Sequence, residues 1–385
     1  MYKLKGFPLG SLFFITVTAC LAFNCNDSSL SRTDKTALTA PAPRVIDTMP
    51  AESVSLQVDT PETFTIIGVG DMMLGTDYPS AGYLPANDGK DLLSEVEDLL
   101  RGADVTFGNL EGTIINEGGK PKRCNNPDAC YVFRSPEHYG RHFAEAGFDL
   151  LSLANNHSGD FGAEGRRRTK AVLDELNIRY AGLASTDETA VYEKDGIRYG
   201  FCAFAPNSGT CDVRNISRAK QIVSSLADRS DIVIVSFHGG AEGAKHQHVT
   251  RKTETYYGEN RGNVYEFAHA VVDAGADIVF GHGPHVTRAA ELYKDRFIIY
   301  SLGNFCTYGR FNLRGAAGIA PLIRLEVDKS GVFLRGEAIP VYQQKTHGPK
   351  VDPQKRAVQK LIDLTKADFP ETNLKIDPSG KLSKE

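Results

Sequence analysis

The sequence lacks an excess of basic residues, which argues against a nucleic-acid-binding protein. Its 48 aspartates and glutamates outnumber its 44 lysines and arginines, so the net charge at pH 7 is −4. Cysteines at the CxxC spacing of a zinc site are also absent. No segment of the mature chain has the length and apolar character of a transmembrane helix. What is present is a globular composition, 41% hydrophobic over 385 residues, enough for one large domain or two ordinary ones.

The N-terminus has the pattern of an export signal. Two lysines precede an apolar stretch over residues 6–17, which is too short to span a bilayer. It ends in Val17-Thr18-Ala19-Cys20, which resembles a bacterial lipobox. That resemblance implies cleavage before Cys20 and lipid attachment to its thiol, and ordinary cleavage with an incidental cysteine is the alternative. Residues 21–62 are rich in Ser, Thr, Asp, Ala and Pro, so we expect a disordered tether.

Two cysteine pairs flank polar loops, and an exported protein could close each as a local disulfide. They are Cys124 with Cys130, and Cys202 with Cys211. The sequence does not determine the pairing, so both disulfides are expectations. Cys25 and Cys306 are left unassigned.

From residue 63 onward, apolar strand patterns alternate with helical patterns. We expect strands over 63–69, 105–108, 150–154, 232–237 and 278–280, and helices over 91–100, 163–176 and 264–274, among others. This alternation predicts parallel pairing with helices on both faces of a sheet. Hairpin patterns over 320–342 predict antiparallel strands added to this core. The fold class is therefore α/β with a mixed sheet.

Polar residues follow five of these strands. Because ligands bind beyond the carboxyl ends of strands in such sheets, we expect one site assembled from several strand ends. Carboxylates, amides and imidazoles together suit a divalent metal ion. The candidates are Asp71, Asn109, Glu111, Asn156, His157, His238, His282 and His285.

Each of these residues also has a structural interpretation. Asp71 could be a helix cap or a turn residue, and Asn109 and Asn155 could hold loops by hydrogen bonding. The remaining histidines are expected to be surface or hydrogen-bonding residues, although His246 and His248 are close enough to His238 in sequence to reach the site. Asn155 and Asp160 are expected to support their loop.

Six motifs, in order, are similar to the CapA family of bacterial capsule and poly-γ-glutamate synthesis proteins. They begin at Gly70-Asp71, Gly108-Asn109, Ala154-Asn155-Asn156-His157, His238-Gly239-Gly240, Gly281-His282-Gly283-Pro284-His285 and Tyr300-Ser301-Leu302-Gly303-Asn304. The family resembles a branch of the calcineurin-like metallophosphoesterases. The resemblance implies an αββα sandwich of mixed sheets flanked by helices, with divalent metal at the strand ends.

The same resemblance suggests a role for each candidate. Asp71, Asn156, His238, His282 and His285 resemble metal ligands, and His157 resembles the catalytic histidine. Glu111, with Asn109, would occupy the position of a bridging carboxylate. The usual Asp-x-His motif reads Asp71-Met72-Met73 here, and a thioether is a poor ligand for a hard metal. We therefore expect one or two ions, with Mn, Fe, Zn and Mg equally compatible.

These observations predict four segments: a lipoprotein signal over 1–20, a tether over 21–62, a CapA-like domain over 63–308, and a hairpin and helix over 309–385 that complete the fold. The expected function is a metal-dependent hydrolase or transferase of the cell envelope, acting on a phosphoester or γ-glutamyl bond of an anionic polymer or its precursor. The alternative is a non-catalytic polymer-binding subunit of a capsule synthesis complex, with Lys120, Lys122, Arg123 and Arg134 as contacts. Membrane-bound capsule synthesis proteins are possible partners. A structural lipoprotein with a degenerate site is a third interpretation.

Overall fold

The computed structural model describes residues 62–124 and 130–385. The predicted lipoprotein signal over 1–20, and all but the last residue of the predicted tether over 21–62, lie outside the described residues. Among the described residues, no helix combines the length and the apolar character that crossing a membrane requires.

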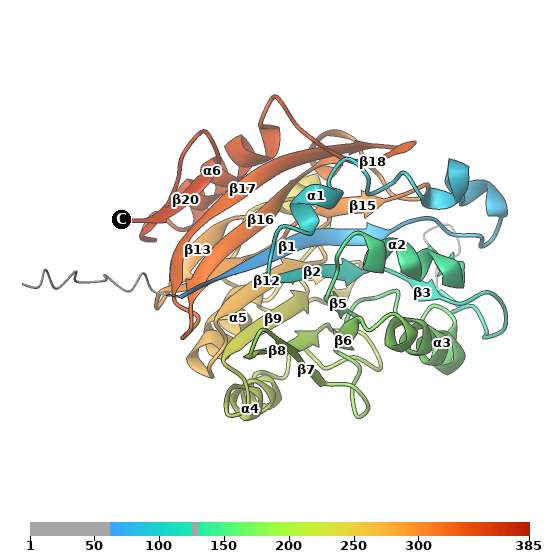
Figure 1. Ribbon diagram of the computed structural model, residues 1–385, viewed down its shortest axis with the longest axis horizontal. Helices are drawn as coiled ribbons and strands as arrows, with labels where there is room; N and C mark the ends of the chain where they lie inside the picture. Colours follow the sequence, from blue (N-terminus) through green and yellow to red (C-terminus); the bar gives the residue numbers. More distant parts are fainter. Residues whose placement is uncertain (1–61, 125–129) are drawn as a thin grey trace, which may run out of the picture. The chain divides into compact units, whose positions relative to one another are not determined.

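The first sheet is mixed and holds strands from both ends of the described chain (Figure 1). Its main path runs β19 (Leu374–Ile376), β20 (Lys381–Lys384), β17 (Phe333–Gln344), β16 (Ile319–Asp328), β1 (Thr63–Met73), β2 (Val105–Leu110), β5 (Leu150–Ser152) and β6 (Arg179–Ala181). Beside this path, β15 (Asn304–Thr307) pairs with β1, and β18 (His347–Val351) pairs with β17. Strands β1, β2, β5 and β6 are parallel to one another, whereas β16 is antiparallel to β1.

The second sheet has six strands and a parallel centre. Its order is β13 (Ala290–Tyr293), β14 (Arg296–Ile299), β12 (Ile278–His282), β9 (Ile232–His238), β8 (Ile197–Phe204) and β7 (Thr189–Lys194). Two short pairs lie outside both sheets: β3 (Thr113–Ile114) with β4 (Arg134–Ser135), and β10 (Thr255–Tyr256) with β11 (Glu259–Asn260).

The core lies between the two sheets. One apolar cluster joins Ile66 and Phe107 of the first sheet to Phe201, Ile234 and Phe280 of the second. The rings of Phe107 and Phe280 stack with centroids 5.3 Å apart and an interplanar angle of 6°. Burial of these inward-facing strand residues holds the sheets face to face.

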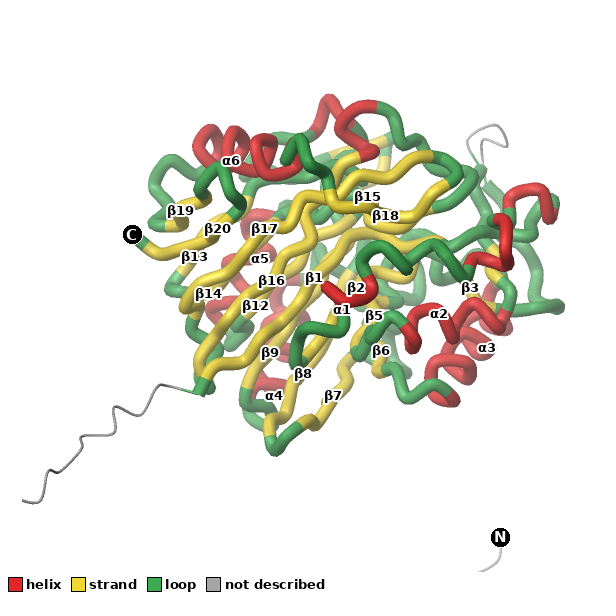
Figure 2. Tube along the Cα trace, turned by 45° about the horizontal axis from the view of Figure 1, so that its top comes forward, coloured by secondary structure: helices red, strands yellow, loops and turns green. Residues whose placement is uncertain are grey.

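Helices cover the outer faces of both sheets (Figure 2). They are α1 (Glu97–Leu100), α2 (Gly140–Glu145), α3 (Gly162–Glu175), α4 (Ile216–Ala227) and α5 (Val264–Asp273). Helix α6 (Arg356–Asp368) instead adds Val358 and Leu361 to the cluster between the sheets. Residues of α2 and α3 share an apolar cluster with β1 and β5, and residues of α4 and α5 share another with β8 and β9. The predicted αββα sandwich of mixed sheets is thus confirmed.

Strand β1 is longer than the sequence pattern predicts, and this length positions Asp71. The strand continues through Asp71 to Met73 because a second parallel partner, β15, takes over where the antiparallel pairing with β16 ends. Its pairing register shifts between Gly68 and Asp71 on the β2 side, and between Asp71 and Met72 on the β15 side. Such bulges redirect side chains, so Asp71 lies at an irregularity of both ladders.

Glycine at position 70 lets two backbones meet beside Asp71. A Cβ atom there would lie 1.9 Å from the carbonyl oxygen of Gly303, far inside van der Waals contact. The Asp71 amide donates a hydrogen bond to that same carbonyl at 2.9 Å. This close approach joins β1 to the turn before β15, and only glycine permits it.

Two expectations from the sequence are wrong. The helix expected over residues 91–100 forms only over Glu97–Leu100, because the Leu92 backbone packs against Gly348 of β18 and turns replace the earlier helical part. The predicted disulfide between Cys124 and Cys130 is present, but Cys202 and Cys211 are free and buried. Both belong to the apolar cluster under α4 and α5, where a free thiol packs as a small hydrophobic group.

Candidate metal centre

Asp71 is the centre of a buried hydrogen-bond cluster at the carboxyl ends of the parallel strands. Its Oδ1 accepts from Asn109 Nδ2 at 2.9 Å and lies 3.1 Å from His282 Nδ1. Its Oδ2 lies 2.8 Å from His285 Nδ1. The contacts with His282 and His285 span 211 and 214 residues of sequence, and they join the two sheets at this end.

Glu111 lies beside Asp71 and is held in the same way. Its Oε1 accepts from Asn109 Nδ2 at 2.9 Å and lies 3.0 Å from His238 Nδ1. Asn109 therefore bridges the two carboxylates through one amide nitrogen. Asp71 and Glu111 are fully buried, and burial of two acids requires compensation by donors or by a cation.

The donor atoms suit a divalent metal ion. One ligand atom each from Asp71, Glu111 and His285 can be chosen such that all three lie within 4.8 Å of one another. Around them, Glu111 Oε2, His238 Nε2 and His282 Nε2 are buried without a hydrogen-bond partner among the described residues. Such orphaned atoms are costly unless something binds them, and carboxylate and imidazole are ligands of Mn, Fe and Zn. The residues present therefore fit a metal.

The electrostatics of the cluster favour charged acids and a charged His285. Burial alone would raise the pKa of the Asp71 carboxyl, but hydrogen bonds from His282 and His285 hold that pKa well below its usual range. Burial likewise opposes ionisation of Glu111, and the charge of His238 outweighs it, so the pKa of Glu111 is also lowered. Burial lowers the pKa of His285, yet the hydrogen bond and charge of Asp71 raise it to about 10.

The backbone that presents His285 is unusual. Its φ of 57° is in the left-handed region, which a non-glycine residue rarely adopts, and it follows Gly283 with φ of 108°. A Cβ at Gly283 would lie 2.9 Å from the amide nitrogen of Gly239, so the two histidine-bearing loops pack closely. Strain of this kind persists where surrounding contacts over-determine the conformation, as the Asp71 contact does here.

His157 lies in a separate but adjoining group. Its Nδ1 lies 2.8 Å from Asp160 Oδ2, and Lys122 Nζ forms an ion pair with Asp160 Oδ1 at 2.6 Å. The Phe133 amide also donates to Asp160 Oδ2 at 2.7 Å. The carboxylate of Asp160 favours a proton on Nδ1, which leaves Nε2 of His157 for chemistry.

Asn155 joins this group to the Asp71 cluster. Its Nδ2 donates to Asn109 Oδ1 at 3.1 Å and to the carbonyl oxygen of Leu110 at 2.8 Å. Its Oδ1 accepts from the amides of His157 and Ser158 at 3.0 and 2.9 Å. Asn155 thus fixes the loop, as expected from the sequence.

The eight candidates therefore divide into a cluster and its neighbours. Six form one contact network: Asp71, Asn109, Glu111, His238, His282 and His285. Asn156 is adjacent to Asn155 in the chain and carries a buried Oδ1 without a hydrogen-bond partner among the described residues. Met73 stands apart from the network, since its sulfur accepts from the Gly75 amide at 3.3 Å.

Other polar residues support the site. Asn304, opposite Asp71 in the pairing of β1 with β15, donates to the carbonyl oxygens of His285 and Ala317. Arg288 is fully buried and forms a two-pronged ion pair with Glu254, while it also donates to the Ala241 carbonyl. The motif around Asn304 was a sequence signal, but no local pattern marks the Arg288–Glu254 pair.

Four of the six remaining histidines lie in the following contacts. His248 bonds Asp368 at the end of α6, His246 packs against the Tyr256 ring, His269 bonds Glu291, and His138 pairs with Asp88. His248 therefore does not join the cluster through the contact it makes. Of the basic residues considered for polymer binding, Lys122 and Arg134 are already paired, with Asp160 and Asp77.

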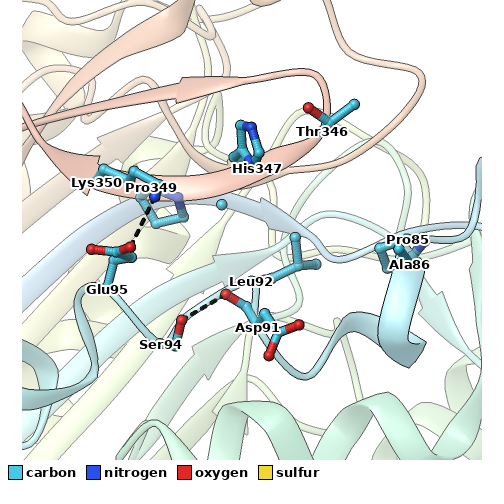
Figure 3. A pocket seen from close by; sticks show the side chains of 11 residues that line it. Pro85, Ala86, Asp91, Leu92, Ser94, Glu95, Thr346, His347, Pro349 and Lys350 are labelled. Atoms are coloured by element: carbon cyan, nitrogen blue, oxygen red, sulfur yellow. Dashed lines mark hydrogen bonds and ion pairs between the residues drawn. The ribbon is translucent and has the colours of Figure 1, made fainter.

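A separate surface hollow of about 220 Å³ lies between the segment before α1 and β18 (Figure 3). Its charged groups are largely satisfied, since Lys350 donates to Glu95 at 2.8 Å across its edge. It contains none of the eight candidate residues.

Comparison with known proteins gives consistent matches over the same region. A family model described as bacterial capsule synthesis protein PGA_cap matches residues 65–308. The chain is 30% identical over 253 residues to the capsule biosynthesis protein CapA of Bacillus anthracis, covering 63% of this chain and 60% of that protein. It is 25% identical over 274 residues to the PGA biosynthesis protein CapA of Bacillus subtilis, covering 66% of each. The matched region thus spans 60 to 66% of the length of these curated relatives.

Among solved structures, a hypothetical protein from Thermus thermophilus aligns with a TM-score of 0.43 at 16% identity. That alignment covers 73% of this chain and 100% of the other.

Proposed function

Because the chain belongs to the PGA_cap family of bacterial capsule synthesis proteins, we propose that it acts on an anionic cell-envelope polymer or its precursor. The proposed activity is metal-dependent hydrolysis or transfer at a phosphoester or γ-glutamyl bond. The observation that carries this proposal is the buried arrangement of Asp71, Glu111 and His285, with orphaned nitrogens of His238 and His282 beside it. The sulfur of Met73, where the usual motif has a histidine ligand, accepts a hydrogen bond from the Gly75 amide, and this favours one bound ion over two.

Each residue of the cluster has a distinct role in this proposal. Asp71, Glu111 and His285 hold the metal, and His238 and His282 complete its surroundings. Asn109 fixes the spacing of the two carboxylates through its bridging amide. A bound divalent ion supplies Lewis acidity and lowers the pKa of a coordinated water.

His157 is the proposed proton donor. Asp160 holds its Nδ1, so Nε2 is free to carry a proton to the leaving group. In hydrolysis, the oxygen of water bonds to the phosphorus or carbonyl carbon and the bond to the leaving oxygen or nitrogen breaks. The leaving atom takes a proton from Nε2 of doubly protonated His157, and the proton that the water gives up restores Nε2 for the next cycle. Asp160 offsets the charge that His157 carries during the cycle.

Two chromogenic substrates test the activity and show which bond is cleaved. p-Nitrophenyl phosphate reports phosphoester cleavage, and γ-glutamyl-p-nitroanilide reports γ-glutamyl cleavage. We expect release from one of them, abolished by a chelator and restored by added Mn²⁺ or Zn²⁺. If neither substrate releases its chromophore in the presence of either metal, the second candidate, a non-catalytic polymer-binding subunit, is favoured. The relatives named for capsule and PGA biosynthesis are compatible with both candidates.

The charge state of His285 predicts how metal binding depends on pH. With its pKa raised to about 10, His285 is protonated at pH 7 and must lose that proton to become a ligand. We therefore expect about one proton released from this residue per ion bound, and an affinity that rises from pH 7 to pH 9. Calorimetric titration of the chelator-treated protein with Zn²⁺ in buffers of different ionisation enthalpy measures this proton. A His285→Gln variant should release one proton fewer, and an unchanged proton count would refute the assignment.

We further propose that the protein is attached to the membrane by lipid on Cys20 and works beside membrane-bound capsule synthesis proteins. The support is the lipobox-like Val17-Thr18-Ala19-Cys20, in a segment outside the described residues. Expression in a bacterial host should place the protein in the membrane fraction, and Cys20→Ser should release it. Mass spectrometry of the N-terminal peptide should show an acylated cysteine, and a peptide without acyl chains would contradict the proposal.

A further inference from the structure

Arg310 is a cation near the site that lacks a carboxylate partner. It follows β15, three residues after Thr307, in the turn that packs on Tyr83. Among the described residues its guanidinium forms no ion pair, whereas Lys122 and Arg134 are each paired with an aspartate. Its guanidinium carbon instead lies 5.3 Å from the ring centroid of Tyr83 and 4.9 Å from that of Tyr131.

The two tyrosines hold the guanidinium without neutralising it. Both rings are partly exposed, at 36% for Tyr83 and 45% for Tyr131. Cation–π contact uses the faces of the guanidinium plane and leaves the N–H groups along its edge for a hydrogen-bond acceptor. Ordering Arg310 in advance also reduces the entropy that a ligand must overcome on binding.

A row of aromatic rings connects this cation to the catalytic groups. Tyr131 contacts Phe133 with ring centroids 6.4 Å apart, and Phe133 stacks on Phe311 at 5.2 Å. Phe133 lies 4.3 Å from the His157 ring, and Phe311 lies 5.6 Å from the His285 ring. The row therefore begins at the exposed Tyr131 and ends at both histidines of the proposed reaction.

The geometry points to a substrate subsite in which Arg310 binds an oxyanion of the substrate while the rest of the molecule lies along Tyr131 and Phe311, whose rings contact the buried Phe133, toward His157. This inference rests on the proposed function, because it assigns the substrate of the same site. The ligand chemistry is a planar or tetrahedral oxyanion on a flexible chain, which a guanidinium binds with two N–H groups. A carboxylate of a γ-linked glutamate chain and a phosphate of a polymer precursor are its two sources.

Binding measurements on the purified full-length protein test this subsite independently of turnover. The probes are penta-γ-glutamate, the same peptide with its α-carboxyls amidated, and inorganic phosphate, each titrated calorimetrically at low salt. We expect Arg310→Gln to weaken binding of one anionic probe by about tenfold or more, since hydrogen bonds to charged groups contribute about that much. Arg310→Lys should retain part of the affinity, and Tyr131→Leu should lose less than Arg310→Gln.

Arg141→Gln is the matched control, because it removes the same charge from an exposed position on α2 and should leave affinity unchanged. If affinity for penta-γ-glutamate depends on Arg310 and affinity for its amide does not, the bound group is a carboxylate. If only affinity for inorganic phosphate depends on Arg310, the bound group is a phosphate. Equal effects of Arg310→Gln and Arg141→Gln, or no binding of either anion by the wild type, would overturn the subsite. If hydrolysis does not depend on metal while binding still depends on Arg310, the proposed catalysis is refuted and the subsite stands.

Discussion

Replacing Asp71 with asparagine is expected to remove metal binding and hydrolysis together. The substitution keeps the shape of the side chain and removes the charge that both His282 and His285 contact. Loss of a residue that merely supports a metal ligand lowers metal affinity by roughly 10- to 100-fold, so loss of the ligand itself should exceed about 100-fold. Turnover should fall to the level of the chelator-treated wild type.

Metal titration and thermal unfolding together measure this change. Wild-type protein should lose thermal stability when the metal is removed, because a ligand that binds only the folded state stabilises it. The Asp71→Asn variant should show the same unfolding temperature with and without added metal. Asp98→Asn, which removes the same charge from a position on α1 outside the cluster, is the control and should behave as wild type. A variant at position 71 that retains full metal affinity would show that the cluster is not the metal site.

Replacing His157 with alanine is expected to abolish most turnover while metal binding persists. His157 lies outside the Asp71 network, and Asn155 bonds the backbone amide of His157, so the His157 side chain can be removed without loss of a proposed ligand. General acid catalysis contributes typically about 10²- to 10⁴-fold, and kcat should fall within that range. The loss should be smaller for a substrate whose leaving group needs no proton, such as p-nitrophenyl phosphate.

Comparison of two substrates separates chemistry from folding. The ratio of kcat for an alkyl ester to kcat for the p-nitrophenyl ester should fall in His157→Ala, whereas a merely destabilised protein would lose both equally. His138→Ala, at an exposed histidine paired with Asp88, is the matched control. An unchanged ratio together with loss of bound metal would make His157 a ligand and not the proton donor.

The sequence predicts the cluster because strand ends are local features. A run such as Ile232 to Val235 followed by His238 shows both the strand and the polar group that it delivers. Parallel pairing then brings such ends to one edge, which is why His238 and His282 are opposite each other in β9 and β12. The αββα arrangement follows from the same alternation together with the family resemblance.

What the sequence does not show depends on long-range contacts. Strand β1 reaches Met73 because β15, more than 200 residues later, supplies a partner, and no local pattern contains that information. The spacing of Cys202 and Cys211 allows a disulfide, but both side chains pack in the apolar layer under α4 and α5. Arg310 looks like any surface arginine until Tyr83 and Tyr131 are placed against it.

The most direct test of the central claim is the metal content of the protein purified without chelator, measured by inductively coupled plasma mass spectrometry beside the Asp71→Asn variant. We expect close to one divalent transition-metal ion per wild-type chain and a small fraction of that in the variant. Wild-type protein that contains no stoichiometric metal, and takes up none when Mn²⁺, Fe²⁺ or Zn²⁺ is supplied, would contradict the assignment of Asp71, Glu111 and His285 as a metal centre.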